Sequence, residues 1–295
     1  MAVASSAPLA QMRSGFVPVG TGLVLHELAG GRGWGRWRRR PVVFLHGVGS
    51  SGILAWRYVL PVAGARSRVF APDLPGFGFS MKPPLRYGVP LFERTLLRYL
   101  DRRGLKRPIV VGESMGGRVA IELALRHPER VGRLILVDSL GFGAPRAPLL
   151  GLLATPVVGD LAYAALQRAY LTLEPDRFRA LAARLGMPTE ALDDGHLGVL
   201  REIHQDPGAG YAQTTTLRSL ALHSLDDVAP RLARLDLPIR LIWGSDDPMF
   251  PVEQGVRAQR QLPGSKLAII EGARHAPSLE RPETFLEALL HYLDD

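Results

Sequence analysis

A serine, an aspartate and a histidine at three separate turns are the residues of this sequence best suited to chemistry. Ser114 stands within Gly-Glu-Ser-Met-Gly, Asp247 within Gly-Ser-Asp-Asp-Pro, and His275 within Gly-Ala-Arg-His-Ala. A serine hydroxyl is a weak nucleophile alone, so it needs an imidazole to take its proton and a carboxylate to orient that imidazole. The three residue types therefore predict nucleophilic attack on an acyl group.

The turn around Ser114 has the form Gly-x-Ser-x-Gly. The apolar residues 108–112 predict a buried strand, and residues 115–126 predict a helix. A serine between such elements is held in a strained conformation, with its hydroxyl at the end of a sheet. The residues two before and two after it must be small because strand and helix crowd there, and Gly112 and Gly116 meet that need.

Alternating strands and helices must position these turns. Apolar runs typical of strands buried on both faces alternate with helical patterns, which predicts a mostly parallel sheet with right-handed crossovers. The predicted strands cover residues 23–28, 41–45, 68–71, 108–112, 134–137, 239–243 and 266–270. Asp247 and His275 follow the last two strands, and the sites of such sheets lie at the carboxyl ends of their strands.

Two further motifs follow strands, His-Gly-Val-Gly at 46–49 and Asp-Leu-Pro-Gly-Phe-Gly at 73–78. With the serine turn and the late Asp and His turns, they make four motifs in order, and the order Ser, Asp, His is that of the α/β-hydrolase architecture. In these motifs the chain resembles the α/β-hydrolase superfamily from about Val24 to the C-terminus. The resemblance implies the α/β-hydrolase fold, a mostly parallel central sheet flanked by helices, with an inserted helical lid.

The resemblance also implies roles for individual residues. Ser114 corresponds to the nucleophile, His275 to the general base and Asp247 to the orienting acid. The oxyanion hole of the family uses the backbone N–H after the nucleophile and one from the loop after the third strand. Here these donors are the amides of Met115 and Val48.

The loop after residues 41–45 supports that second donor. Gly47 and Gly49 allow the loop to approach the substrate, and His46 is expected to brace it rather than to take part in catalysis. A serine at position 114, where dehalogenase and epoxide-hydrolase relatives carry aspartate, argues against both of those activities. One departure from the family is Arg274, where glycine commonly precedes the histidine.

Two other aspartates compete with Asp247 for the role of the acid. Asp246 is its neighbour, but the family's loop usually reads Gly-x-x-Asp, which fits Gly244 and Asp247. Asp138 follows strand 134–137, a position from which some members supply the acid. It is expected instead to cap the end of that strand.

The rhythm of strands and helices stops between residues 141 and 225, where the periodicity is helical and leucine-rich. We expect residues 1–140 and 226–295 to form the core domain and residues 141–225 to form the inserted lid. Residues 1–16 are expected to be a loose arm. Six other histidines are expected to lie on the surface or in exposed parts of the lid: His26, His127, His196, His204, His223 and His291.

The amino-acid composition limits the chemistry, the compartment and the partners that the protein can have. The 295 residues include no cysteine, which excludes disulfides and thiol catalysis, and the chain begins without a secretory signal pattern. The net charge of +8 comes from scattered arginines, except for a cluster at Arg36 and 38–40 expected in an exposed hairpin. We therefore expect a cytoplasmic protein with no nucleic-acid partner and no stable membrane insertion. The sequence does not reveal its oligomeric state.

The expected reaction is hydrolysis of a carboxylic ester with an apolar acyl or alcohol group, because apolar residues dominate the lid. It needs no metal and no organic cofactor. Carbon–carbon hydrolases of ring-cleavage products share the scaffold, but many carry tryptophan after the histidine, where this chain has Ala276. Lactone hydrolysis, perhydrolysis and acyl transfer remain open. A ligand-binding receptor on the same scaffold is the alternative outside enzymes, although such receptors often lose a triad member.

Overall fold

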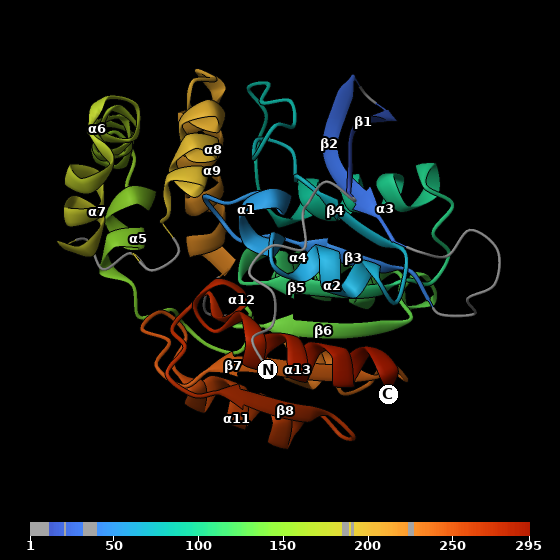
Figure 1. Ribbon diagram of the computed structural model, residues 1–295. Coiled ribbons are helices and arrows are strands. Elements are labelled where there is room, and N and C mark those ends of the chain that lie inside the picture. The colour runs from blue at the N-terminus through green and yellow to red at the C-terminus, as the bar shows by residue number, and fades with distance from the viewer. Residues whose placement is uncertain (1–11, 21, 32–39, 185–188, 190–191, 224–226) are drawn as a thin grey trace.

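A twisted sheet runs through the centre of the molecule, as Figure 1 shows for the computed structural model. The structure describes residues 12–20, 22–31, 40–184, 189, 192–223 and 227–295. Within them eight strands form one sheet in the order β1-β2-β4-β3-β5-β6-β7-β8. The strands are β1 (Arg13–Gly20), β2 (Leu23–Gly30), β3 (Val42–Leu45), β4 (Val69–Pro72), β5 (Ile109–Glu113), β6 (Arg133–Val137), β7 (Ile239–Gly244) and β8 (Lys266–Ile270).

Strands β3 to β8 are parallel, and the side chains of β3, β5, β6 and β7 alternate between two buried cores. In β3, Val43 and Leu45 belong to one core while Val42 and Phe44 belong to the other. A strand covered on both faces must be apolar throughout, which explains the continuous apolar runs in the sequence.

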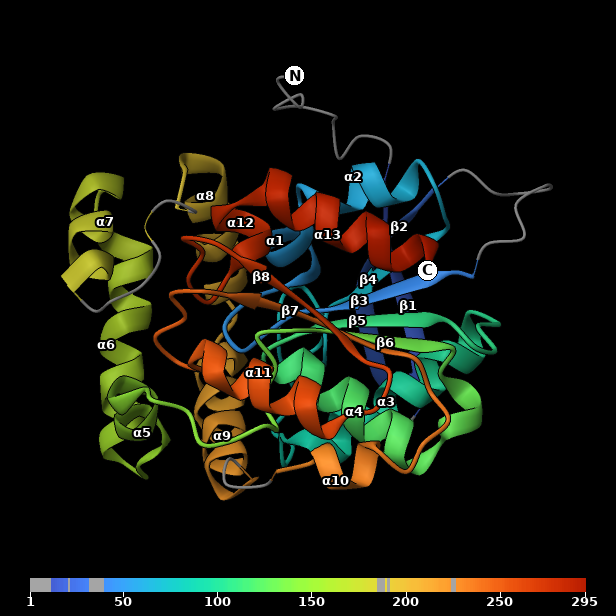
Figure 2. The same ribbon diagram turned by 90° about the horizontal axis from the view of Figure 1, so that it is seen from below.

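Helices cover both faces of the sheet, as the view in Figure 2 makes clear. One face carries α1 (Gly52–Trp56), α2 (Val59–Gly64) and α13 (Pro282–Asp294), with α12 (Pro277–Glu280) at its end. The other face carries α3 (Val89–Arg102), α4 (Met115–Arg126), α10 (Ala229–Leu232) and α11 (Val252–Gln261). A short 3-10 helix, η2 (Pro128–Arg130), leads into β6. This layering is that of a doubly covered α/β sheet.

The N-terminal edge of the sheet is antiparallel and begins earlier than expected. Strand β1 pairs with β2 from Arg13 to Gly20, and β2 pairs with β4. The expectation of a loose arm up to residue 16 was therefore wrong for its last residues. Val17 and Val19 alternate inward while Phe16 stays exposed, a weak pattern because one face of this edge strand meets solvent.

The described residues between β6 and β7 form helices and no strand beyond an isolated bridge between Phe142 and Asp227. The helices are α5 (Pro148–Ala154), α6 (Val158–Thr172), α7 (Pro175–Arg184), α8 (Asp194–His204) and α9 (Gly208–His223), followed by α10. Figure 1 places α5 to α9 beyond one end of the sheet. That end is the one at which the parallel strands finish, so these helices stand over the predicted site.

In the described part of the chain, no single helix is both long and apolar enough to cross a bilayer. Helices α5 and α6 together meet the criteria of length and composition, but they meet at an angle of 110°. The arginine cluster at 36 and 38–40 lies outside the described residues apart from Arg40.

Candidate active site

Ser114 occupies a strained turn between β5 and α4. Its backbone has φ of 53° and ψ of −115°, a region that non-glycine residues rarely enter. The turn is held on both sides, because the N–H of Ser114 donates to the carbonyl of Val137 at 3.0 Å and its own carbonyl accepts from Leu140 at 3.2 Å. The end of strand β6 and the loop that follows it therefore hold the strained turn in place.

The glycines around Ser114 leave no room for a side chain. A Cβ on Gly112 would lie 2.5 Å from the carbonyl oxygen of Gly116, and one on Gly116 would lie closer still to that of Leu45. These contacts are with backbone, which cannot rotate away. Strand β3, strand β5 and helix α4 therefore meet only because both positions are glycine.

Replacing one of these glycines gives a prediction about stability. Gly116→Ala should lower the free energy of unfolding by about 1–3 kcal/mol, the usual cost of overpacking, as measured by chemical denaturation. Gly198→Ala is the matched control, since Gly198 lies exposed within α8 and a Cβ added there would meet nothing within 4 Å. Alanine there should be neutral or stabilise by up to about 1 kcal/mol. If Gly116→Ala and Gly198→Ala changed the free energy of unfolding equally, the interpretation that the turn around Ser114 is crowded would be wrong.

His275 and Asp247 are paired at the ends of β8 and β7. Nδ1 of His275 lies 2.8 Å from Oδ2 of Asp247, and the carboxylate is nearly inaccessible to solvent. Oδ1 of Asp247 accepts the N–H groups of Met249 at 2.8 Å and Phe250 at 3.1 Å. Because these backbone donors fix the carboxylate, it can in turn fix the plane and the tautomer of the imidazole.

The other two aspartates are placed differently. Asp246 is exposed and accepts the hydroxyl of Ser245 at 2.9 Å. Asp138 is fully buried, and its Oδ1 accepts the N–H of Gly244 at 2.9 Å, so it ties β6 to β7. Burial first, and then the negative charge of Asp247, holds the pKa of Asp138 well above its usual value. Of the three carboxylates, the structure brings Asp247 to the histidine.

The two predicted oxyanion donors belong to residues at the same cavity as Ser114. Met115 is the first residue of α4, so its N–H has no acceptor within the helix. Val48 and Met115 line the same cavity as Ser114. A Cβ on Gly47 would touch the Cβ of Ser114 at 3.3 Å, so the absence of a side chain at position 47 lets the loop reach the serine. Gly49 has φ of +76°, a turn conformation that suits glycine.

His46 forms hydrogen bonds within that loop and to a neighbouring loop. It is completely buried; Nδ1–H donates to the carbonyl of Gly47 at 2.8 Å, and Nε2 accepts the N–H of Leu74 at 3.0 Å. Burial lowers the pKa of His46, which keeps the ring neutral for these two bonds. The loop after β3 is thereby joined to the loop after β4.

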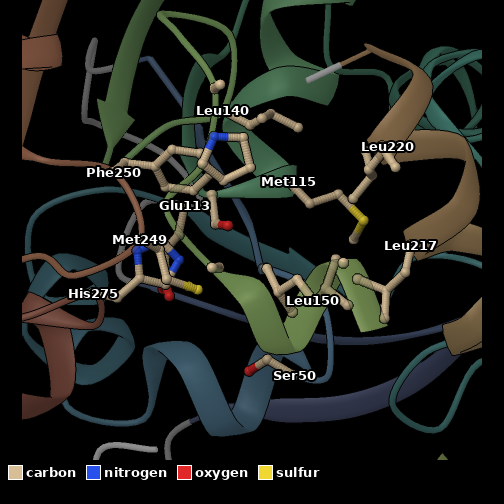
Figure 3. Close-up of a pocket in the computed structure, with 18 residues that line it drawn as sticks. Ser50, Glu113, Met115, Leu140, Leu150, Leu217, Leu220, Met249, Phe250 and His275 are labelled. Atoms are coloured by element: carbon tan, nitrogen blue, oxygen red, sulfur yellow. The ribbon is translucent and has the colours of Figure 1, made fainter. Parts of the chain in front are cut away.

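Ser114 and His275 open on one cavity of about 410 Å³. Its wall is mostly apolar and combines strand ends with the helices that stand over them. In Figure 3, Met115, Leu150, Leu217 and Leu220 lie on one side and Met249, Phe250 and His275 on the other. The lining residues are Gly47, Val48, Ser50, Glu113, Ser114, Met115, Leu140, Ala144, Pro145, Ala147, Leu150, Gly151, Leu217, Leu220, Ala221, Met249, Phe250 and His275.

Two glutamates at the site were not predicted from the sequence. Glu280 accepts the N–H groups of Arg274 at 2.5 Å and Ala276 at 3.0 Å, so it holds the turn on both sides of His275. Glu113 lines the cavity directly before Ser114. Its place between Gly112 and Ser114 was the available signal, since a residue at the end of a buried strand must face one of the two cores or the site. No cluster in the described residues is placed to hold a metal ion.

Three histidines expected at the surface are buried instead. His26 lies on β2 with Nδ1 2.8 Å from Oδ2 of Asp73, which also accepts the N–H of Phe79. His196 and His204 lie inside the helical segment, and burial lowers the pKa of each to about 4. The expectations failed because a polar partner or a neighbouring helix, neither visible in one segment of sequence, permits burial.

Comparison with known proteins agrees with this architecture. The alpha/beta hydrolase fold family matches residues 40–282. A 2-hydroxy-6-oxononadienedioate/2-hydroxy-6-oxononatrienedioate hydrolase of Dechloromonas aromatica is 30% identical over 260 residues, which cover 85% of this chain and 86% of that protein. A pimeloyl-[acyl-carrier protein] methyl ester esterase of Aeromonas hydrophila is 28% identical over 253 residues, 85% of this chain and 94% of that protein.

Among solved structures, the 2-hydroxy-6-oxo-6-phenylhexa-2,4-dienoate hydrolase of Rhodococcus sp. strain RHA1 has a TM-score of 0.74 at 25% identity, covering 96% of this chain and 99% of that one. The fold expected from the four motifs is thus confirmed, and these relatives are hydrolases. The chain belongs to the alpha/beta hydrolase family.

Proposed function

We propose that the protein is a serine hydrolase that cleaves carboxylic esters with an apolar acyl or alcohol group through an acyl-enzyme on Ser114. One observation carries the proposal: the imidazole of His275, oriented by Asp247, opens on the same cavity as the strained Ser114. A nucleophile, a base and an acid that share one cavity are the requirements of acyl transfer.

In the first half of the proposed reaction, Ser114 attacks the ester carbonyl while its proton passes to His275. The new bond joins Oγ to the carbonyl carbon, and the amides of Val48 and Met115 hold the oxyanion. One such donor contributes about 3 kcal/mol to the transition state. His275 then protonates the leaving alcohol as the bond to it breaks, which leaves the acyl group on Ser114.

In the second half, water replaces the alcohol. His275 takes a proton from the water as it attacks the acyl carbon, and returns that proton to Oγ of Ser114 as the acid leaves. Asp247 stabilises the imidazolium in both halves. No metal or organic cofactor enters these steps. We further propose that α5 to α9 serve as the lid of this site, because Leu150 of α5 and Leu217 and Leu220 of α9 supply part of its wall.

The relatives support cleavage of an ester and of a carbon–carbon bond equally. The ring-cleavage substrates in their names end in -oate and so carry a carboxylate. None of the residues that line the described cavity is lysine or arginine, and Glu113 is itself a carboxylic acid. A buried carboxylate without a cationic partner is costly. This lining favours a neutral ester and leaves carbon–carbon hydrolysis as the second candidate.

A panel of p-nitrophenyl esters tests the proposal. We expect kcat/KM to rise about fourfold for each added methylene from acetate to butyrate, the factor for burying one methylene, until the cavity is filled. The test compound for the second candidate is 2-hydroxy-6-oxo-6-phenylhexa-2,4-dienoate. Its turnover should be about 100-fold slower, because its carboxylate would meet no cationic partner among the lining residues. Faster turnover of this compound than of every ester would reverse the order of the two candidates.

A further inference from the structure

Glu113 is a polar group that the proposed reaction does not use. It ends β5 directly before Ser114, and its side chain lines the cavity. The residue is only 7% exposed, and its Oε2 is buried with no hydrogen-bond partner among the described residues. In the view of Figure 3 its carboxyl group lies between Phe250 and Met115. A buried polar atom that lacks a partner in the protein is a candidate to receive one from a ligand.

The charges around Glu113 are mostly negative. Among the described residues, the acids Asp247, Glu280 and Asp138 are close enough to interact with its charge, whereas the imidazole of His275 favours its ionised form. Burial first raises the pKa of Glu113 to about 7, and the two acids add to that effect against His275. Glu113 is therefore mostly protonated below pH 7 and mostly ionised above it.

A protonated carboxyl is a hydrogen-bond donor that needs an acceptor. Within the described residues its Oε2 has no hydrogen-bond partner, and Met115 and Phe250, between which its carboxyl group lies in the view of Figure 3, have apolar side chains. A buried donor without a partner costs about 1–3 kcal/mol. A ligand oxygen placed beside Glu113 would recover that cost.

We propose that Glu113 in its acid form is a substrate-binding residue that donates a hydrogen bond to a second oxygen of the ester, separate from the scissile carbonyl. The inference rests on the proposed hydrolysis at Ser114 and narrows its substrates. The favoured class is esters with an ether, keto or second carbonyl oxygen within a few atoms of the reacting carbon. Ionised Glu113 cannot donate, so the preference for such esters is present below pH 7 and lost above it.

Two p-nitrophenyl esters of the same length test this proposal. Methoxyacetate differs from butyrate by one oxygen in place of a methylene, and both use the same leaving group and the same triad. The measured quantity is the ratio of kcat/KM for methoxyacetate to that for butyrate. Titration of His275 and Asp247 affects both esters alike and cancels in this ratio, which leaves the effect of Glu113.

In the unchanged protein the ratio should fall about fivefold between pH 6 and pH 8.5, the value of one hydrogen bond. Glu113→Gln keeps a donor that does not titrate, so its ratio should stay high at both pH values. Glu113→Leu has no donor, so its ratio should be low at both. Glu129→Gln is the matched control, because Glu129 is exposed in η2 before β6, at the opposite end of the sheet. It should behave as the unchanged protein does.

A ratio in the unchanged protein that does not vary with pH, or a decline that persists in Glu113→Gln, would overturn the role of Glu113. If the Glu113→Leu variant does not fold, the pH dependence of the ratio in Glu113→Gln and in the unchanged protein is sufficient to test the proposal. Failure of the proposed function looks different, since butyrate would then show no hydrolysis that depends on Ser114. That result would overturn the proposed function and this inference together.

Discussion

Ser114→Ala is expected to lower kcat/KM for p-nitrophenyl butyrate by about four orders of magnitude or more, as the loss of a triad nucleophile does. Without Oγ no acyl-enzyme can form, and His275 has no proton to transfer from the serine. The oxyanion amides and the cavity stay in place, so a small residual rate over water should survive. Initial rates with substrate well below KM measure the effect.

The fold should not change in this variant. The backbone of Ser114 is held by Val137 and Leu140 through main-chain bonds that alanine keeps. The circular dichroism spectrum and the denaturation midpoint should therefore match those of the unchanged protein. Ser265→Ala is the control, because Ser265 precedes β8 at the far end of the sheet, and its activity should stay within about twofold. Full activity in Ser114→Ala would place the nucleophile elsewhere.

The two adjacent aspartates should differ sharply. Asp247→Asn is expected to reduce kcat by about four orders of magnitude, because an amide in place of the carboxylate holds the imidazole in the wrong tautomer. Asp246→Asn should stay within about threefold, since Asp246 is exposed and its Oδ1 accepts from Ser245 rather than from His275. The pair is a matched test, because both changes remove one charge from the same turn.

Steady-state kinetics at a pH where His275 is neutral measures both variants. Equal losses would contradict the assignment of Asp247 as the orienting acid. A large loss in Asp246→Asn alone would mean that the turn rearranges in solution so that the neighbouring carboxylate faces the histidine.

Much of the fold could be predicted because parallel strands that are buried on both faces appear in the sequence as continuous runs of apolar residues. Strands β3, β5, β6 and β7 are largely apolar on both faces, and β3, β5 and β7 each end at a turn motif that the sequence shows. Strand β1 was not predicted because only one of its faces is buried, and its formation depends on pairing with β2. The helices over the sheet could be expected as a class, but their packing depends on contacts between distant residues.

Some residues of the candidate site could also be predicted from the sequence, and others could not. The motifs predicted which turns would meet, and the structure brings Ser114, His275 and Asp247 to one end of the sheet; their catalytic roles remain predictions. The choice of Asp247 over Asp246 rested on loop spacing, whereas the structure supplies a contact with His275. Glu113 and Glu280 could not be assigned from the sequence, because a carboxyl group is usually exposed and only the tertiary fold shows that these two are buried.

Labelling with a fluorophosphonate probe tests the central claim most directly. We expect the probe to form a bond between its phosphorus and Oγ of Ser114 with loss of fluoride, and peptide mass spectrometry to find the adduct at this residue. Labelling should be absent in Ser114→Ala and in the denatured protein, and strongly slowed in His275→Ala, which lacks the base. No adduct on Ser114 in the folded, unchanged protein would contradict the account and favour a binding protein on a hydrolase scaffold.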